Sequence, residues 1–329
     1  MTPWLTADEH LPRSLPAGLT PADLARIDKA VAAHHAPATL TTYASAWREF
    51  EAWCDARGFT ALPAAPEVVC AYMTSQAERG LTMGMVACTL AAIAHRHRGA
   101  GLDDPTDSEL VTRVRTGLRR ILGVAPRRRA RPLLVEDIRE ILAAVDRATA
   151  IGKRDAAIIL LGFASAMRRC ELAALELADI APAQGGLLIT VRRSKGDPHG
   201  HGQTIAIAQG RHSDADPVGA LHAWLRVRPG DVGSVFTQVR ANSTVTREPI
   251  NAASVVRIVK TRAHAVGFTG DRITAHSLRA GHATSAAMAG VPLDRIAAQT
   301  RHRDLAMLVN TYIRPITALQ TSSSRHLGL

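Results

Sequence analysis

Basic side chains recur in the second half of the chain next to apolar, helix-forming segments. Arg168 and Glu171 are three residues apart in MRRCEL, which ends a long apolar run, and His276 and Arg279 have the same spacing in HSLR. Residues three apart share one face of a helix. Guanidinium groups held on such faces are suited to binding an anion, and above all a phosphate group.

Three further side chains extend this basic set. Lys195 follows a strand-like segment in RSKGD, His302 lies in TRHRD, and Tyr312 ends the next helical segment in NTYIR. Every member of the whole basic set has an ordinary structural explanation when it is taken alone. Arg168 could form a surface ion pair, His302 could cap a helix, and Tyr312 could be a half-buried packing residue. The chain has only three tyrosines, and Tyr312 is the one that lies near this set.

Signatures of nucleotide and metal sites are absent from the sequence. The chain contains neither a G-x-x-x-x-G-K-[ST] loop nor a G-x-G-x-x-G motif after a strand. No acidic cluster in the second half is suited to Mg²⁺, which disfavours two-metal nucleases and polymerases. The histidine pairs (His34/His35, His95/His97 and His199/His201) lack further ligands at metal spacing. We therefore predict no metal and no cofactor.

The charge of the chain favours a polyanionic partner. The 329 residues include 36 arginines and four lysines, and the formal net charge is +11. Coding bias in a GC-rich genome explains much of the arginine excess, and a run of like charge is often only a solvated face. Between Arg113 and Arg131, however, eight arginines occur without an acidic residue. This run favours nucleic acid as the partner.

Candidate nucleic-acid contacts lie on one helical face and in the arginine-rich stretch. Tyr43, Trp47, Phe50 and Cys54 form an apolar stripe that is expected to be core. The opposite face offers hydroxyls and a guanidinium, which are suited to phosphates and base edges. The predicted contact residues are Thr41, Ser45, Arg48, Arg113, Arg120, Arg127, Arg128 and Arg129.

Helical patterns dominate the chain, so the predicted fold class is mainly α (α+β), with a small antiparallel sheet. The expected helices are one capped by Thr39 and others over 66–79, 82–95, 108–122, 134–145, 154–177, 220–226, 252–266, 277–289, 293–300 and 305–312, with strands at Gly186–Val191 and Gln203–Ala208. The length predicts two domains. We expect a flexible segment over 1–16, a helical domain over 17–122, an arginine-rich linker over 123–132, a second domain over 133–314 and a tail over 315–329.

The sequence contains no signal for export or membrane insertion. No apolar run approaches the roughly 20 residues that span a bilayer, and residues 1–20 lack the pattern of a signal peptide. The four cysteines form no C-x-x-C pair and are expected to be buried thiols. We therefore expect a cytoplasmic protein that does not contact a membrane.

The order and local context of the basic set resemble the tyrosine recombinases, also called phage integrases, and in particular their Cre-like members. The matching segments are FASAMRRCELAAL (163–175), SKGD (194–197), HSLRAGHAT (276–284) and RHRDLAMLVNTYIR (301–314), with TTYASAWREFEAWC (41–54) in the first half. The resemblance extends from about His34 to Arg314.

The resemblance implies a phosphoryl-transfer site. Tyr312 would be the nucleophile that forms a phosphotyrosine ester and so conserves the bond energy without metal or ATP. Arg168 and Arg279 would bind the nonbridging oxygens of the scissile phosphate, and His302 would donate one more hydrogen bond.

The remaining roles implied by the resemblance concern protons and positioning. Lys195 would protonate the departing 5′ oxygen as general acid, and His276 would take the tyrosine proton and return it during religation. Glu171 would orient Arg168 or His276 without transferring a proton.

The resemblance also implies an assembly. The helical domain would bind DNA, and four protomers would act on two specific sites through a Holliday junction, each docking residues 315–329 into its neighbour. A type IB topoisomerase-like relaxing enzyme and a catalytically silent DNA-binding protein are the alternatives.

Two features depart from the family pattern. His302 and Tyr312 are ten residues apart, one more than expected. The helix expected to face the major groove offers Gly84, Met85, Cys88 and Ala92, which have few donors for base readout.

Overall fold

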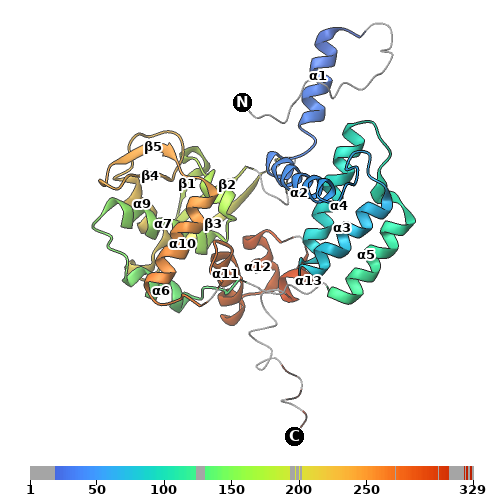
Figure 1. The fold of residues 1–329 in the computed structure, drawn as a ribbon. Helices are drawn as coiled ribbons and strands as arrows, with labels where there is room; N and C mark the ends of the chain where they lie inside the picture. Colours follow the sequence, from blue (N-terminus) through green and yellow to red (C-terminus); the bar gives the residue numbers. More distant parts are fainter. Residues whose placement is uncertain are drawn as a thin grey trace. The chain divides into compact units, whose positions relative to one another are not determined.

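The structure is a computed structural model that describes residues 19–123, 130–192, 202–270, 272–302 and 304–310, with Asp197, Gly200, Ser322, Ser324 and Leu327 (Figure 1). The chain divides into two compact units, Met1–Arg127 and Arg128–Leu329. Each unit has its own buried core.

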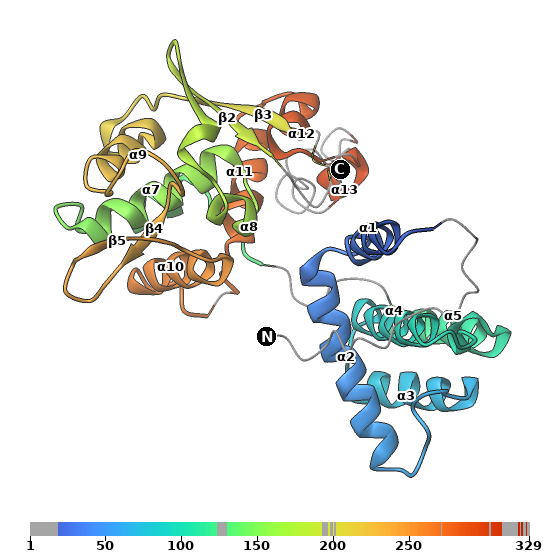
Figure 2. The same cartoon turned by 90° about the horizontal axis from the view of Figure 1, so that it is seen from above.

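The first unit is helical in its described part. Its elements are α1 (Pro21–Ala32), α2 (Pro37–Asp55), α3 (Pro66–Glu78), α4 (Met83–Gly99), the 3-10 turn η1 (Pro105–Asp107) and α5 (Glu109–Leu122). α2 packs against α4, and α3 packs against α5 (Figure 2). The core between these helices includes Phe50, Val69, Met73 and Ile93.

Local sequence signals explain the helix boundaries of this unit. The helices predicted over 66–79 and 108–122 are confirmed to within one residue, while the helix predicted over 82–95 continues to Gly99. The predicted cap at Thr39 is wrong, because α2 already begins at Pro37. Proline fits the first turn of a helix, where its missing N–H is not needed.

The predicted apolar stripe of α2 is mostly core. Trp47, Phe50 and Cys54 are buried. Tyr43 is only half-buried, and its ring centroid lies 5.7 Å from that of His35 and 5.5 Å from that of His95.

The second unit is mainly α with two small antiparallel sheets, so the predicted fold class is confirmed. Its described elements are α6 (Val135–Ala143), α7 (Ala150–Ser165), α8 (Arg169–Ala173), η2 (Leu177–Asp179), β1 (Ile180–Ala183), β2 (Gly186–Val191), β3 (Gln203–Ala208), η3 (Ser213–Ala215), α9 (Pro217–Leu225), β4 (Thr237–Val239), β5 (Val245–Pro249), α10 (Ala252–Ala265), α11 (His276–Met288), α12 (Leu293–Thr300) and α13 (Leu305–Leu308).

The two predicted strands are confirmed as β2 and β3, which pair with Gly186 opposite Ala208 and Val191 opposite Gln203. β1 adds a third strand to this sheet, and β4 and β5 form a separate hairpin. These strands were not expected, because β1 contains Pro182 and neither β4 nor β5 alternates buried with exposed residues.

α7 is the central helix of the second unit. It contacts α9, α10, α11 and β3, so its residues from Ala156 to Gly162 are buried on every side. The single helix predicted over 154–177 is wrong. α7 ends at Ser165, Ala166 adopts the left-handed conformation (φ 49°), and α8 starts at Arg169.

The cysteines are only partly buried. All four are free thiols: Cys54 and Cys70 are buried and Cys88 is half-buried. The prediction of a buried thiol is wrong for Cys170, which is exposed on the first turn of α8, where it faces solvent. Within the described residues, no helix combines the length and the apolar character needed to cross a bilayer.

Candidate active site

The turn between α7 and α8 places Arg168 and Glu171. Ala166 accepts a left-handed conformation, which costs a non-glycine residue about 1–2 kcal/mol. The Glu171 carboxylate then accepts hydrogen bonds from the Arg168 backbone N–H (2.8 Å) and from Arg168 Nη1 (2.8 Å). Glu171 therefore fixes both the backbone and the side chain of Arg168.

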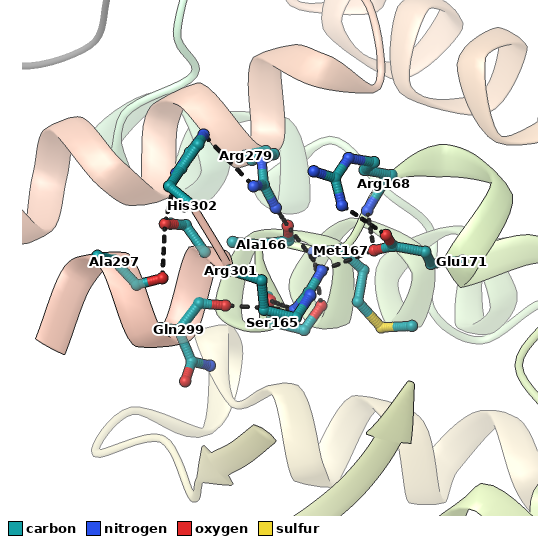
Figure 3. A network of polar contacts seen from close by, with 11 residues as sticks. Ser165, Ala166, Met167, Arg168, Glu171, Arg279, Ala297, Gln299, Arg301 and His302 are labelled. Atoms are coloured by element: carbon teal, nitrogen blue, oxygen red, sulfur yellow. Dashed lines mark hydrogen bonds and ion pairs between the residues drawn. The ribbon is translucent and has the colours of Figure 1, made fainter. Parts of the chain in front are cut away.

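Side chains from α11 and from the end of α12 bind the last carbonyls of α7. Gln299 Nε2 donates to Ala164 O (3.0 Å). Arg279 Nη1 donates to Ala166 O (2.7 Å) (Figure 3). Arg301 Nη1 donates to the carbonyl between them, that of Ser165 (3.3 Å). The last carbonyls of a helix have no partner within the helix, and cations at this end also interact favourably with the helix dipole.

His302 lies between Arg279 and Thr300. Arg279 Nη2 is 3.4 Å from His302 Nε2, and Thr300 Oγ1 is 2.7 Å from His302 Nδ1. The Thr300 hydroxyl also contacts the Ile296 carbonyl at 2.7 Å, to which it must donate. Because a guanidinium only donates and this hydroxyl hydrogen is already used, the neutral ring carries its hydrogen on Nδ1. Burial, followed by the charges of Arg279 and Arg168, lowers the pKa of His302 to about 4.

Glu171 joins two arginines in a buried ion network. Its Oε1 binds Arg168, and its Oε2 lies 2.6 Å from Arg301 Nη2. Burial by itself would raise the pKa of Glu171, but the Arg301 charge and the hydrogen bonds from Arg168 outweigh it and lower the pKa. The carboxylate is therefore ionised at neutral pH, with the guanidinium of Arg168 on one side and that of Arg301 on the other.

His276 begins α11 one turn before Arg279 and reaches the surface. Partial desolvation by the surrounding protein, together with the charges of Arg279 and Arg168, lowers the pKa of His276. The same two arginines lower the pKa of His302, so both rings lie within electrostatic range of both guanidiniums. Near neutral pH both imidazoles are neutral, and His276 is able to accept a proton.

The arrangement is chemically suited to an anion with dispersed negative charge. Arg168 is partly open, with 25% of its side chain exposed, whereas Arg279 lies deeper at 2% exposure for the whole residue. Guanidiniums fixed in this way stabilise charge that develops on phosphate oxygens.

Comparisons with known proteins identify the family. Residues 131–318, more than half of the chain, match the phage integrase family. Over 278 residues the chain is 33% identical to the integrase/recombinase XerD homologue of Selenomonas ruminantium, which covers 84% of this chain and 81% of that protein. The chain belongs to the phage integrase family. It is a tyrosine site-specific recombinase of the Cre-like kind, and it is 28% identical over 208 residues to the recombinase Cre of Escherichia phage P1, with 59% of each chain covered.

Solved integrase structures share the fold of this recombinase. A λ integrase dimer bound to a COC′ core site matches with a TM-score of 0.58 and 18% identity, covering 87% of this chain and 93% of that one. The Tn1549 transposon integrase in complex with transposon right-end DNA matches with a TM-score of 0.59 and 15% identity, covering 94% and 100%.

The candidate site brings together most of the predicted residues. Arg168, Glu171, His276, Arg279 and His302 gather around the end of α7. Lys195 and Tyr312 lie outside the described residues. Within the described part of the chain, no group of three or more His, Cys, Asp or Glu side chains is placed to hold a metal ion.

Arg301 is one of the site residues that the sequence did not predict. It adjoins His302 in TRHRD, and this adjacency was the one available signal. Its contact with Glu171 spans 130 residues of sequence, and its left-handed backbone (φ 56°) has no marker such as glycine.

The predicted DNA-contact residues of the first unit are exposed where they are described. Thr41, Ser45 and Arg48 lie on the exposed face of α2, and Arg113 and Arg120 are exposed on α5. The predicted contacts Arg127, Arg128 and Arg129 fall outside the described residues.

Proposed function

We propose that this recombinase cleaves and rejoins double-stranded DNA at specific sites through a 3′-phosphotyrosine on Tyr312 and a Holliday junction, without metal or ATP. The observation that supports it is the convergence of Arg168, Arg279 and His302 on the end of α7, since these residues come from three separate parts of the chain. Such convergence is typical of a preorganised oxyanion site.

The proposed chemistry is one displacement at phosphorus. The Tyr312 oxygen forms a bond to the scissile phosphorus, and the bond from phosphorus to the 5′ oxygen breaks. The phenol proton passes to His276, whose lowered pKa keeps it neutral and able to accept. Lys195 gives its proton to the 5′ oxygen. Rejoining reverses these steps with the 5′ hydroxyl of the exchanged strand.

During this step the remaining residues stabilise charge. Arg168 and Arg279 bind the nonbridging oxygens, and Glu171 holds Arg168 in place. In the neutral ring of His302, Nε2 carries no hydrogen. The negative charge of the incoming phosphate raises the pKa of His302, and the protonated ring then donates a hydrogen bond to the phosphate.

The proposed assembly is a homotetramer on two DNA sites in the cytoplasm. A λ integrase tetramer bound to a Holliday junction shares the fold, with a TM-score of 0.57 and 17% identity. Residues 123–132 would lie on phosphates as an arginine-rich linker between the DNA-binding domain (17–122) and the catalytic domain (133–314), and residues 315–329 would dock into a neighbouring protomer. Free of DNA, the chain would be a monomer.

The test is covalent capture of DNA. Wild-type protein incubated with genomic fragments in EDTA should yield DNA that stays attached after denaturation with detergent, and sequencing this DNA reveals the target site. Tyr312→Phe should abolish the adduct while gel-shift binding survives, because only the nucleophilic oxygen is removed.

Two outcomes would contradict this proposal. Recombination by the Phe variant would exclude Tyr312 as nucleophile. Relaxation of any supercoiled plasmid by a monomer, without paired sites, would show a type IB topoisomerase-like enzyme instead.

A further inference from the structure

We propose that Arg301 is a positioning residue that keeps the positive charge of Arg168 available for the scissile phosphate by neutralising Glu171. The inference rests on the proposed function, because it concerns the same phosphate site. It adds a third arginine, which supports the site without contacting DNA, to the two arginines that are expected to contact DNA.

The hydrogen bonds of Arg301 commit its guanidinium to groups inside the protein. Its side chain is 3% exposed, against 25% for Arg168. Its Nη1 donates to Ser165 O and to Gln299 O (3.2 Å), and its Nη2 binds Glu171. A guanidinium committed to these groups points into the protein, so its effect on a phosphate has to pass through a neighbour.

The neighbour is Glu171, which lies between the two arginines. Both carboxylate oxygens are used, Oε1 by Arg168 Nη1 and Oε2 by Arg301 Nη2 and the Arg168 N–H. The side chain of Glu171 is 1% exposed, so water does little to screen its charge. In this low-dielectric setting the nearest cations determine how strongly the negative charge of Glu171 acts on Arg168.

Formal charge shows what Arg301 contributes. With Arg301, the three side chains carry a net charge of +1, and this charge is available to an anion at the exposed end of Arg168. Without Arg301, Arg168 and Glu171 cancel. A phosphate would then meet a neutral pair and would have to compete with Glu171 for the guanidinium.

The backbone supports the same role. Arg301 is held in the left-handed region at the end of α12, directly before His302. Its Nε is buried without a hydrogen-bond partner. A strained backbone and an unsatisfied buried donor both oppose folding. Such features persist only where other contacts of the surrounding structure hold them in place. The ion pair with Glu171 supplies these contacts and joins the segment of His302 to the segment of Arg168.

The first experiment compares four variants with the wild type. Arg301→Met removes the charge and keeps the length, and Arg301→Lys keeps the charge. Arg301→Met combined with Glu171→Gln removes both opposite charges and returns the set to +1. Arg295→Met changes an exposed arginine on the same helix and is the matched control. Thermal denaturation of each variant reports its folding.

The first readout needs no DNA. Inorganic phosphate is titrated into each protein and followed by NMR of the arginine side chains. Arg301→Met should bind phosphate about tenfold more weakly than wild type, while Arg301→Lys and Arg295→Met should stay within about threefold of wild type. The double variant should bind phosphate more tightly than Arg301→Met, because the set of charges is again +1. A purely structural role predicts that the double variant is worse than Arg301→Met, and that result would overturn the proposal.

The second readout uses the DNA site recovered by covalent capture, with either a normal phosphate or a methylphosphonate at the scissile position. The methyl group removes one negative oxygen, so it lowers the demand for positive charge. Arg301→Met should slow adduct formation about 100-fold on phosphate and less than about fivefold on methylphosphonate. Equal slowing on both substrates, or no slowing, would overturn the proposal.

The two readouts separate this inference from the proposed function. Wild-type protein that binds phosphate but forms no Tyr312 adduct contradicts the proposed chemistry, and the phosphate titration then decides the role of Arg301. Wild-type protein that forms the adduct while Arg301→Met equals it in both readouts overturns the inference alone. Wild-type protein that neither binds phosphate nor forms an adduct overturns both.

Discussion

At the scale of single residues, the Thr300 hydroxyl determines which nitrogen of His302 carries hydrogen. It donates to Ile296 O at 2.7 Å and accepts from His302 Nδ1, so Nε2 faces Arg279 with a lone pair. The pKa of about 4, lowered first by burial and then by Arg279, keeps the ring neutral at pH 7.5. The free site therefore orients His302 through an uncharged hydrogen bond.

Replacing Thr300 with Val should allow His302 to adopt both neutral tautomers. In ¹⁵N NMR spectra at pH 7.5 the wild-type His302 should show a protonated Nδ1, and Thr300→Val should show a mixture of tautomers. The lost hydrogen bond is worth about 0.5–1.5 kcal/mol, so chemical denaturation of Thr300→Val should show a free energy of unfolding lowered by about that amount. Thr300→Ser keeps the hydroxyl and should behave as wild type. A wild-type spectrum in Thr300→Val would show that another group holds the ring.

The sequence predicted these residues to different degrees. Arg168, Arg279 and His302 stood out because each lies in a distinctive local segment, and the structure brings them together. Arg301 and Thr300 did not, because their importance comes from contacts across the fold. Arg301 reaches Glu171 over 130 residues of sequence, and no local pattern encodes such a contact.

At the scale of elements, the close passage of α11 over Leu133 positions His276 and Arg279. A Cβ on Gly281 would lie 1.7 Å from Leu133 O, and the same segment is fixed by the hydrogen bond from Leu133 N to Ser277 O at 3.0 Å. Only a glycine lets this helix approach the backbone so closely.

Gly281→Ala should therefore push α11 away from its neighbour. Overpacking of this kind lowers the free energy of unfolding by about 1–3 kcal/mol, and cleavage should fall because the two proposed catalytic residues of α11 move. Gly117→Ala on α5 meets open space and should stabilise the protein by up to about 1 kcal/mol through helix propensity. Chemical denaturation measures both, and equal stability of the two variants would contradict the packing argument.

The element boundaries also show where sequence patterns stop being informative. α12 and the strands β2 and β3 have the predicted bounds, because their apolar periods are clear. The break after α7 was missed, because the left-handed turn at Ala166 has no glycine to mark it and is fixed by Arg279 and Arg301 from elsewhere in the chain.

At the scale of the whole molecule, the net charge is distributed unequally. Met1–Arg127 contains 13 basic and 13 acidic residues, so the entire net charge of +11 lies in Arg128–Leu329. Each unit also has a hydrophobic core made of its own residues. The two units are therefore expected to fold separately and to differ in how strongly salt affects their binding to DNA.

This expectation is tested with the two fragments Met1–Arg127 and Arg128–Leu329. Circular dichroism should show a cooperative thermal transition for each, because each core is complete. Binding to DNA releases counterions, so log K falls with log salt by about 0.9 per phosphate neutralised. Arg128–Leu329 should retain more than half of the salt slope of the full chain, and Met1–Arg127 should show a shallow one. Equal slopes would mean that exposed arginines such as Arg113 and Arg120, rather than net charge, govern the electrostatics. Replacing these two with alanine in the full chain should then reduce the slope by about two.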